Sequence, residues 1–169
     1  MFFEKSFKNS FDFFFFLETH HKDENDIPNE LMRYEDTYDI VHSPRDENNT
    51  YTGIIGLIRK EYKVTDIEQT IQGRILTLKL TDTTGETTYR FSVVYFPTNN
   101  KFELDYMQNI VQKLRLADDS DTSNFMIFGD FNFIDHDRDK RYGLSPKDTN
   151  LNKIWTPFIE EMDMVDPFR

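Results

Sequence analysis

The chain has 169 residues, of which 37% are hydrophobic and 15% aromatic, so it is long enough for one core-forming domain and too apolar for a disordered acidic chain. Its formal net charge of -11 argues against a uniformly basic DNA-coating protein, because Lys and Arg supply most of the affinity of such proteins for phosphates. Since the sequence has no cysteine, it excludes disulfides and thiolate metal sites and favours an intracellular location.

The first third of the chain predicts short strands around one short helix. Phe13–Leu17 is a continuous apolar run that stops at a polar segment, which predicts a strand buried on both faces. The run is too short to span a bilayer, so we expect no membrane partner. A short helix is predicted for residues 29–34, and further strands for residues 38–42 and 54–58.

The middle of the chain predicts an antiparallel strand pair. Residues 74–80 alternate between apolar and polar side chains with period two, and residues 81–86 have the composition of a turn. Residues 90–95 are again mostly apolar or aromatic. We therefore expect residues 74–80 and 90–95 to be neighbouring antiparallel strands.

Two amphipathic helices are predicted in the second half, over residues 101–116 and 150–162. In the first, apolar residues recur at helical spacing with charges between them, so we expect it to cross back over a sheet. Between the helices, residues 125–128 predict a buried strand and residues 135–148 a charged loop. Antiparallel strands with two crossing helices favour an α+β sandwich, in one domain over residues 1–169.

Two polar signatures directly follow apolar strands and supply the candidate functional residues. The first, at residues 17–20, reads Leu-Glu-Thr-His, and the second, at residues 129–132, reads Gly-Asp-Phe-Asn. A carboxylate from each signature, brought together at the strand ends, would form an oxygen-rich site suited to Mg²⁺. Taken alone, each signature is more often ordinary turn chemistry.

The conjunction of motifs resembles the endonuclease/exonuclease/phosphatase superfamily. Between the two signatures, Gly73-Arg74 enters a strand and Val94-Tyr95-Phe96-Pro97 ends one. The pattern is most similar to the apurinic-type endonuclease domain of non-LTR retrotransposons, whose members have a similar Gln-Glu-Thr-His, Tyr-x-Pro-Asn and Gly-Asp-Phe-Asn. Residues 135–138, which contain an Asp-Arg pair, and residues 164–169 resemble further segments of these domains.

The resemblance implies a deoxyribonuclease I-like fold, a partial four-layer α/β/β/α sandwich, with a phosphodiesterase site. In that site Glu18 would bind Mg²⁺, or Mn²⁺ in its place. Asp130 would orient or deprotonate the attacking water, and Asn132 would donate a hydrogen bond to the scissile phosphate or its leaving oxygen. Tyr95 would hydrogen-bond the phosphate from the facing strand. In such a site the cation and the neutral donors stabilise negative charge while the carboxylate activates water.

The chain also departs from the family pattern. Thr98 stands where Asn usually follows Tyr-x-Pro, and Leu17 stands where Gln is common. The family's first strand, which carries an Asn, and its late Ser-Asp-His have no counterpart here, and none of the four histidines replaces the missing one convincingly. We therefore expect a truncated domain of marginal solubility and impaired catalysis, since a general acid or base typically contributes about 10²–10⁴-fold.

Three functions remain open on the sequence. The leading one is a Mg²⁺-dependent DNA endonuclease domain of a mobile element, with a nuclear location expected from the resemblance alone. The second is a phosphatase on the same scaffold that acts on a phosphoinositide or small phosphoester. The third is an inactive remnant or interaction module. The Asp-Arg pair in residues 135–138 favours nucleic acid, and the sequence leaves the oligomeric state open.

Overall fold

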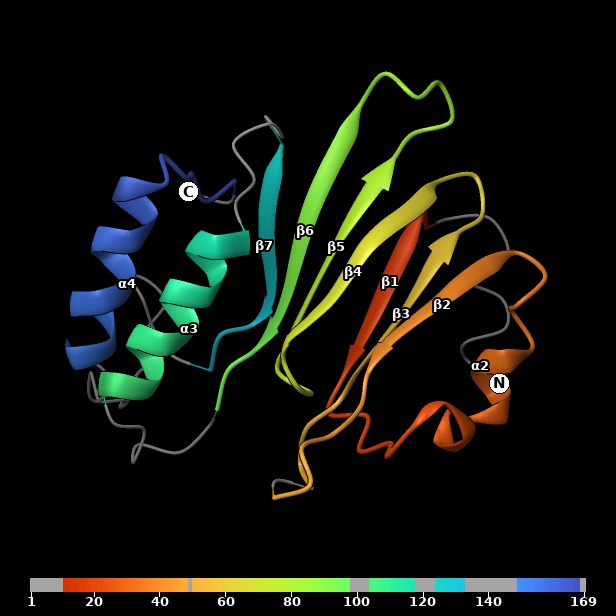
Figure 1. Ribbon diagram of the computed structural model, residues 1–169, viewed down its shortest axis with the longest axis horizontal. Coiled ribbons are helices and arrows are strands. Elements are labelled where there is room, and N and C mark those ends of the chain that lie inside the picture. The colour runs from red at the N-terminus through yellow and green to blue at the C-terminus, as the bar shows by residue number, and fades with distance from the viewer. Residues whose placement is uncertain (1–10, 49, 98–103, 118–123, 133–148, 168–169) are drawn as a thin grey trace, which may run out of the picture. The chain divides into compact units, whose positions relative to one another are not determined.

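The computed structural model describes residues 11–48, 50–97, 104–117, 124–132 and 149–167. The chain groups into two compact units, Met1–Tyr95 with Ser120–Asp130, and Phe96–Asp119 with Phe131–Arg169. The first unit contains two β-sheets, and the second contains two long helices (Figure 1). The single domain expected over the whole chain stays a prediction. The departure at Thr98 and the loop predicted for residues 135–148 lie outside the described residues.

The first sheet has three antiparallel strands in the order β1-β3-β2. They are β1 (Phe13–Leu17), β2 (Tyr38–Ser43) and β3 (Ile54–Arg59), which confirms the strands predicted there. Gly56 of the central strand β3 lies opposite Phe15, and a Cβ at Gly56 would collide with the Phe15 ring. The glycine therefore lets the aromatic strand pack closely against β3.

β1 is an edge strand, which corrects the prediction of a strand buried on both faces. Among the described strands only β3 pairs with it, so its side chains are half-buried and Phe13 is 38% exposed. Phe13 contacts the Phe91 ring of the second sheet at a centroid distance of 5.0 Å. On the opposite face, Phe14 and Phe16 join a cluster with Leu31, Tyr34, Tyr38, Ile40 and Leu57. The run is apolar because both of its faces pack, although neither is fully covered.

Two short turns of helix connect β1 to β2. They are a 3-10 turn, η1 (Glu24–Asp26), and a single α-helical turn, α2 (Asn29–Met32). The second confirms the short helix predicted for residues 29–34.

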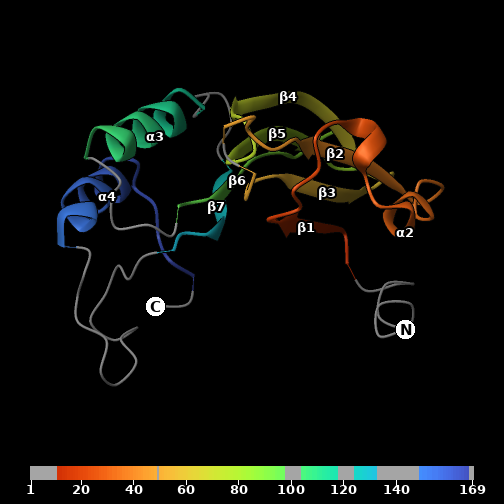
Figure 2. The same ribbon diagram turned by 90° about the horizontal axis from the view of Figure 1, so that it is seen from below.

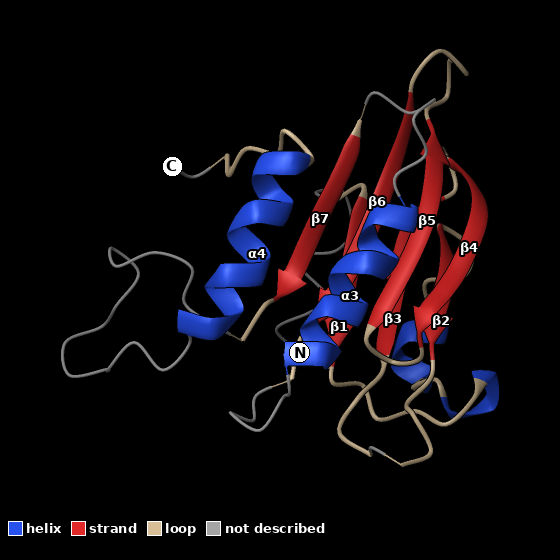
Figure 3. Ribbon diagram, turned by 60° about the vertical axis from the view of Figure 1, so that its left-hand side comes forward, coloured by secondary structure: helices blue, strands red, loops and turns tan. Residues whose placement is uncertain are grey.

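The second sheet has four strands in the order β4-β5-β6-β7 (Figure 3). They are β4 (Lys63–Ile71), β5 (Ile75–Thr81), β6 (Thr88–Tyr95) and β7 (Phe125–Asp130). β5 and β6 pair in antiparallel register, as the sequence predicts for these segments. β7 runs parallel to β6 and is half-buried, which corrects the prediction of a buried strand. The sequence pattern missed β4, whose side chains are mainly polar and exposed.

The core of the first unit lies between the two sheets, which are stacked face to face (Figure 2). Its fully or nearly fully buried members are Val41, Ile54, Ile58, Leu76, Leu78, Leu80, Phe91 and Val93. Alternate residues of β5 belong to this core, which explains the period-two pattern in its sequence.

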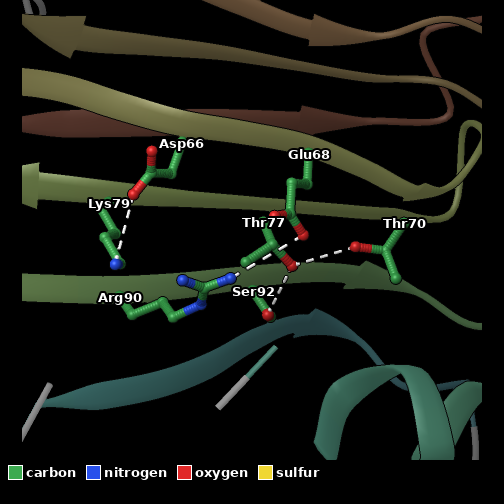
Figure 4. Close-up of polar contacts among 7 residues, drawn as sticks. All are labelled: Asp66, Glu68, Thr70, Thr77, Lys79, Arg90 and Ser92. Atoms are coloured by element: carbon green, nitrogen blue, oxygen red, sulfur yellow. Dashed lines mark hydrogen bonds and ion pairs between the residues drawn. The ribbon is translucent and has the colours of Figure 1, made fainter. Parts of the chain in front are cut away.

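The other face of the second sheet carries a network of polar contacts over β4, β5 and β6 (Figure 4). Thr77 and Ser92 are fully buried, and their hydroxyl oxygens lie 2.8 Å apart in a hydrogen bond between β5 and β6. Two ion pairs cross the same face, Lys79–Asp66 at 3.3 Å and Arg90–Glu68 at 3.8 Å. Every residue of this network lies on β4, β5 or β6, so the network fastens these three strands together.

The second unit is a helical pair, α3 (Leu104–Ala117) and α4 (Thr149–Glu161), which confirms both predicted helices. Arg115 of α3 pairs with Glu161 of α4 through Nε at 3.1 Å. The buried side chains of the pair include Met107, Ile110, Val111, Leu114, Trp155 and Phe158. The crossing of the first helix over a sheet stays a prediction. Neither these helices nor the shorter ones in the described ranges have the length and hydropathy that crossing a bilayer requires.

Candidate active site

Three of the four predicted site residues lie at strand ends of the first unit. Glu18 directly follows β1, Tyr95 is the last residue of β6, and Asp130 is the last residue of β7. The parallel register of β6 and β7 places Asp130 directly beside Tyr95. Asp130, the carboxylate residue of the second polar signature, is therefore the neighbour of Tyr95 across the two strands.

Tyr95 joins the two sheets at this point. Its hydroxyl donates a hydrogen bond to Glu18 Oε1, so a side chain of the second sheet holds a carboxylate of the first. Tyr95 is only 4% exposed, whereas Glu18 is exposed. The observed partner of the Tyr95 hydroxyl is Glu18, the residue predicted to bind the metal. The contact of Tyr95 with a phosphate stays a prediction.

The surroundings of Tyr95 raise the pKa of its hydroxyl to about 12. Burial is the largest cause, followed by the hydrogen bond to Glu18 and the negative charge of Glu18. Asp130 adds to the effect, and Arg74 opposes it. At neutral pH the hydroxyl is therefore protonated and acts as a hydrogen-bond donor rather than as a base.

Arg74 fixes Tyr95 from the neighbouring strand end. Its guanidinium carbon lies 5.0 Å from the centre of the Tyr95 ring, and its Nη1 donates to the Tyr95 carbonyl at 3.1 Å. The Tyr95 amide in turn donates to the Arg74 carbonyl at 2.8 Å. Sequence reasoning used Gly73-Arg74 only as a motif and missed Arg74 as a site residue. The signal in the sequence that could have identified Arg74 is a single cationic side chain directly before a mostly apolar strand.

Gly129 explains why a glycine precedes Asp130. Its φ of 142° lies in the region that favours glycine, and a Cβ there would collide with the Val94 carbonyl oxygen. The glycine allows β7 to approach β6 closely enough to bring Asp130 beside Tyr95. The glycine of the Gly-Asp-x-Asn signature thus has a packing role in positioning the carboxylate.

Asn132 belongs to the second unit. Its Nδ2 donates to the Phe96 carbonyl at 2.6 Å, which ties the segment after β7 to the segment after β6. The Phe96 ring meets those of Phe131 and Trp155 at centroid distances of 5.4 and 5.6 Å. The observed role of Asn132 is therefore to connect two chain segments, and its contact with a phosphate stays a prediction.

A tight turn presents Glu18. Glu18 and His20 both have left-handed backbones, with φ of 55° and 59°, and such residues cost of order 1–3 kcal/mol each. Two backbone hydrogen bonds hold the turn to the start of β3, Thr19 N to Gly53 O at 3.2 Å and His20 N to Thr52 O at 2.9 Å. The position of the carboxylate thus depends on the contacts that offset this strain.

The described side chains fit a hydrated divalent cation. Mg²⁺ binds proteins through one or two carboxylates and keeps several waters, and Glu18 and Asp130 are two exposed carboxylates near one tyrosine. The Glu18 carboxylate, whose Oε1 accepts the Tyr95 hydrogen bond, would hold the ion. Within the described residues, no group of three or more His, Asp or Glu side chains gathers into a ready metal cluster.

Comparison by sequence and by structure gives different results. No protein-family model matches the chain, and no curated protein matches it significantly in sequence. The AP endonuclease LMAP from Leishmania major has a similar structure, with a TM-score of 0.66 and 16% identity over 94% of this chain. A truncated TDP2 from Caenorhabditis elegans has a TM-score of 0.53 and 15% identity over 77% of this chain.

The chain spans 59% of the length of the Leishmania major protein and 52% of the Caenorhabditis elegans one. At these identities the likeness is one of fold. Two stacked sheets, few helices and these neighbours together show that the chain has an α+β fold of the deoxyribonuclease I-like type.

Proposed function

We propose that this chain carries the site of a divalent-metal-dependent phosphodiesterase that hydrolyses DNA. The observation that supports the proposal most strongly is the bond from the Tyr95 hydroxyl to Glu18, with Asp130 beside Tyr95 in the register of β6 and β7. One residue from each of three separate motifs lies at this place. If the signatures were only ordinary turns, their residues would have no reason to meet.

Glu18 is the residue we assign to the metal. A divalent cation bound there would neutralise the negative charge that builds on the phosphoryl oxygens during hydrolysis. The exposed carboxylate is accessible to a hydrated ion, and the Tyr95 hydroxyl keeps it in one orientation. Loss of either feature should weaken metal binding.

Asp130 is the residue we assign to the attacking water. Its carboxylate would orient the water and take its proton as the oxygen attacks phosphorus and the bond to the leaving oxygen breaks. The leaving oxygen would then take a proton from solvent. Asn132 is assigned as a hydrogen-bond donor to the phosphate or the leaving oxygen on the sequence resemblance alone.

DNA is the proposed substrate for two reasons. The Asp-Arg pair in residues 135–138 resembles a segment of retroelement endonuclease domains, and one structural neighbour is an AP endonuclease. We further propose that the chain derives from such a mobile element and acts on nuclear DNA. Nothing observed in the first unit favours a small phosphoester over DNA.

The test is nicking of supercoiled plasmid by the purified chain with Mg²⁺, Mn²⁺ or EDTA. Glu18→Gln and Asp130→Asn preserve side-chain size while removing the charge, and each should lower nicking by about 10²-fold or more. Glu68→Gln, on the far face of the second sheet, removes an exposed carboxylate away from the site and is the matched control. It should nick like the wild type.

Two outcomes would contradict the proposal. Nicking that persists in EDTA or in both site variants would point to a contaminating nuclease. No nicking by a chain that melts cooperatively would favour the inactive remnant, unless a soluble phosphoester is hydrolysed by the same preparation, which would favour the phosphatase.

A further inference from the structure

Beneath the Glu18 turn, His21 is buried and hydrogen-bonded through both ring nitrogens. It is 2% exposed, and buried polar groups of this kind are normally paired. Its Nδ1 lies 2.7 Å from Thr19 Oγ1, and its Nε2 lies 3.2 Å from His42 Nδ1. A continuous chain of three side chains therefore runs from the residue after Glu18 to strand β2.

Either direction of proton donation along this chain leaves its atoms paired. Thr19 can donate to His21, which then donates to His42, or His42 can donate to His21, which then donates to Thr19. Burial and the neighbouring His42 lower the pKa of His21, which favours the neutral ring that both arrangements use. The hydrogen bonds among these three side chains are therefore stable at neutral pH.

Two of these three side chains, Thr19 and His21, pack against the segment that leads into β3. Gly53 has a φ of 121°, and a Cβ there would lie 2.6 Å from Thr19 Oγ1 and 3.2 Å from His21 Nδ1. The carbonyl of His42 also accepts a hydrogen bond from Gln69 Nε2 at 3.3 Å. Thr19 and His21 therefore lie against the residue that leads into β3, and His42 is bonded to β4 of the second sheet.

This position matters because the Glu18 turn is strained. Glu18 and His20, on either side of Thr19, both have left-handed backbones, and such conformations persist only where the surroundings hold them. The two backbone bonds of the turn hold Thr19 and His20, and the hydrogen bond between Thr19 Oγ1 and His21 Nδ1 adds a side-chain contact to the same turn. The backbone of this turn sets the direction of the exposed Glu18 side chain, so contacts that hold the turn also orient the carboxylate.

We propose that Thr19, His21 and His42 form a relay that holds the Glu18 turn, and that His21 and His42 are positioning residues for the Glu18 carboxylate. The inference rests on the proposed function, because it assigns these residues to the same metal site. They act on the metal through Glu18 and do not bind it themselves.

The test measures the affinity of the chain for Mn²⁺ alone, from the electron paramagnetic resonance signal of the unbound ion. Thr19→Val and His42→Leu remove one relay bond each and should weaken Mn²⁺ binding about tenfold or more, as loss of residues that orient metal ligands typically does. Thr19→Ser keeps the hydroxyl, and His42→Asn places a nitrogen near the position of Nδ1. Both should bind Mn²⁺ close to the wild-type affinity.

Thr77→Val is the matched structural control. It removes a buried hydroxyl that bonds to Ser92 on the far face of the second sheet, so it should lower the melting temperature without changing Mn²⁺ affinity. If His42→Leu does not fold, the Thr19→Val and Thr19→Ser pair decides, because valine has nearly the shape of threonine. Equal Mn²⁺ affinity in Thr19→Val and wild type would overturn the inference, and so would an equal loss in Thr77→Val.

Glu18→Gln distinguishes failure of the proposed metal site from failure of the proposed relay. Weaker Mn²⁺ binding in Glu18→Gln with unchanged binding in the relay variants overturns the inference and leaves the proposed function intact. Unchanged binding in Glu18→Gln, or no binding by the wild type, overturns the metal site and the inference with it.

Discussion

The Tyr95 hydroxyl donates a hydrogen bond to the Glu18 carboxylate, and so connects the last residue of β6 to the first residue after β1. The two residues are 77 positions apart in sequence, and only the stacking of the two sheets brings them together. Arg74 holds the tyrosine by its ring and its backbone, so the hydroxyl is a fixed donor. Changes at Tyr95 should therefore be felt at Glu18.

Tyr95→Phe should weaken Mg²⁺-dependent nicking while leaving the fold intact. The variant removes one oxygen atom and keeps the ring, so Glu18 loses the donor that orients it. We expect the Mg²⁺ concentration for half-maximal nicking to rise about tenfold or more. Tyr89→Phe, which removes a hydroxyl from a half-buried ring on the same strand, is the control and should not shift the Mg²⁺ requirement.

The raised pKa of Tyr95 predicts a loss of stability at alkaline pH. Its folded pKa of about 12 exceeds the ordinary value of 10.0, so its contribution is complete below pH 10 and is lost as the pH rises through 12. A shift of this size corresponds to about 2–3 kcal/mol. Urea unfolding between pH 9 and 12 should show a steeper decline in the wild type than in Tyr95→Phe, and identical slopes would contradict the assignment.

The lowered pKa of His21 predicts the opposite dependence at mildly acidic pH. Burial and His42 lower the pKa, against the opposing charges of Asp26 and Asp23. The contribution of His21 is therefore complete above its ordinary value of 6.5 and is lost as the pH falls through the lower, folded value. Thermal melts from pH 7.5 to 5 should decline less steeply in His21→Gln than in the wild type. A steeper decline in the variant would show that another group is responsible.

Gly129→Ala should destabilise the chain and abolish metal-dependent nicking. Alanine at a φ of 142° is strained, and its Cβ would collide with the Val94 carbonyl, so the cost should exceed about 1 kcal/mol. Gly85→Ala is the matched control, because Gly85 also has a positive φ of 74° but no atom lies within 4 Å of an added Cβ. Urea unfolding should show the larger loss for Gly129→Ala, and equal losses would show that the collision is unimportant.

Sequence patterns predicted the elements of this fold better than their environment. Alternation in residues 74–80 identified β5 because its leucines face the core, whereas the apolar run of β1 gave no sign that β1 is an edge strand. Strand order depends on contacts between distant residues, which periodicity does not record. The mostly polar β4 was missed for the same reason, since its pairing with β5 rather than a buried face makes it a strand.

The candidate site divides in the same way. Motifs identified Glu18, Tyr95 and Asp130, each at the end of its strand, but no pattern indicated that Tyr95 donates to Glu18. The bond between His21 and His42 joins residues 21 positions apart, the first in the loop after β1 and the second in β2, so no sequence pattern indicated it. Both facts depend on how the strands pack.

The rate of plasmid nicking by wild type and Asp130→Asn at saturating Mg²⁺, with EDTA added midway, tests the central claim most directly. We expect Mg²⁺-dependent nicking by the wild type that stops when EDTA is added, and a rate at least about 10²-fold lower in the variant. Equal rates in the two proteins, or nicking that continues after EDTA, would contradict a metal-dependent phosphodiesterase site at Glu18, Tyr95 and Asp130.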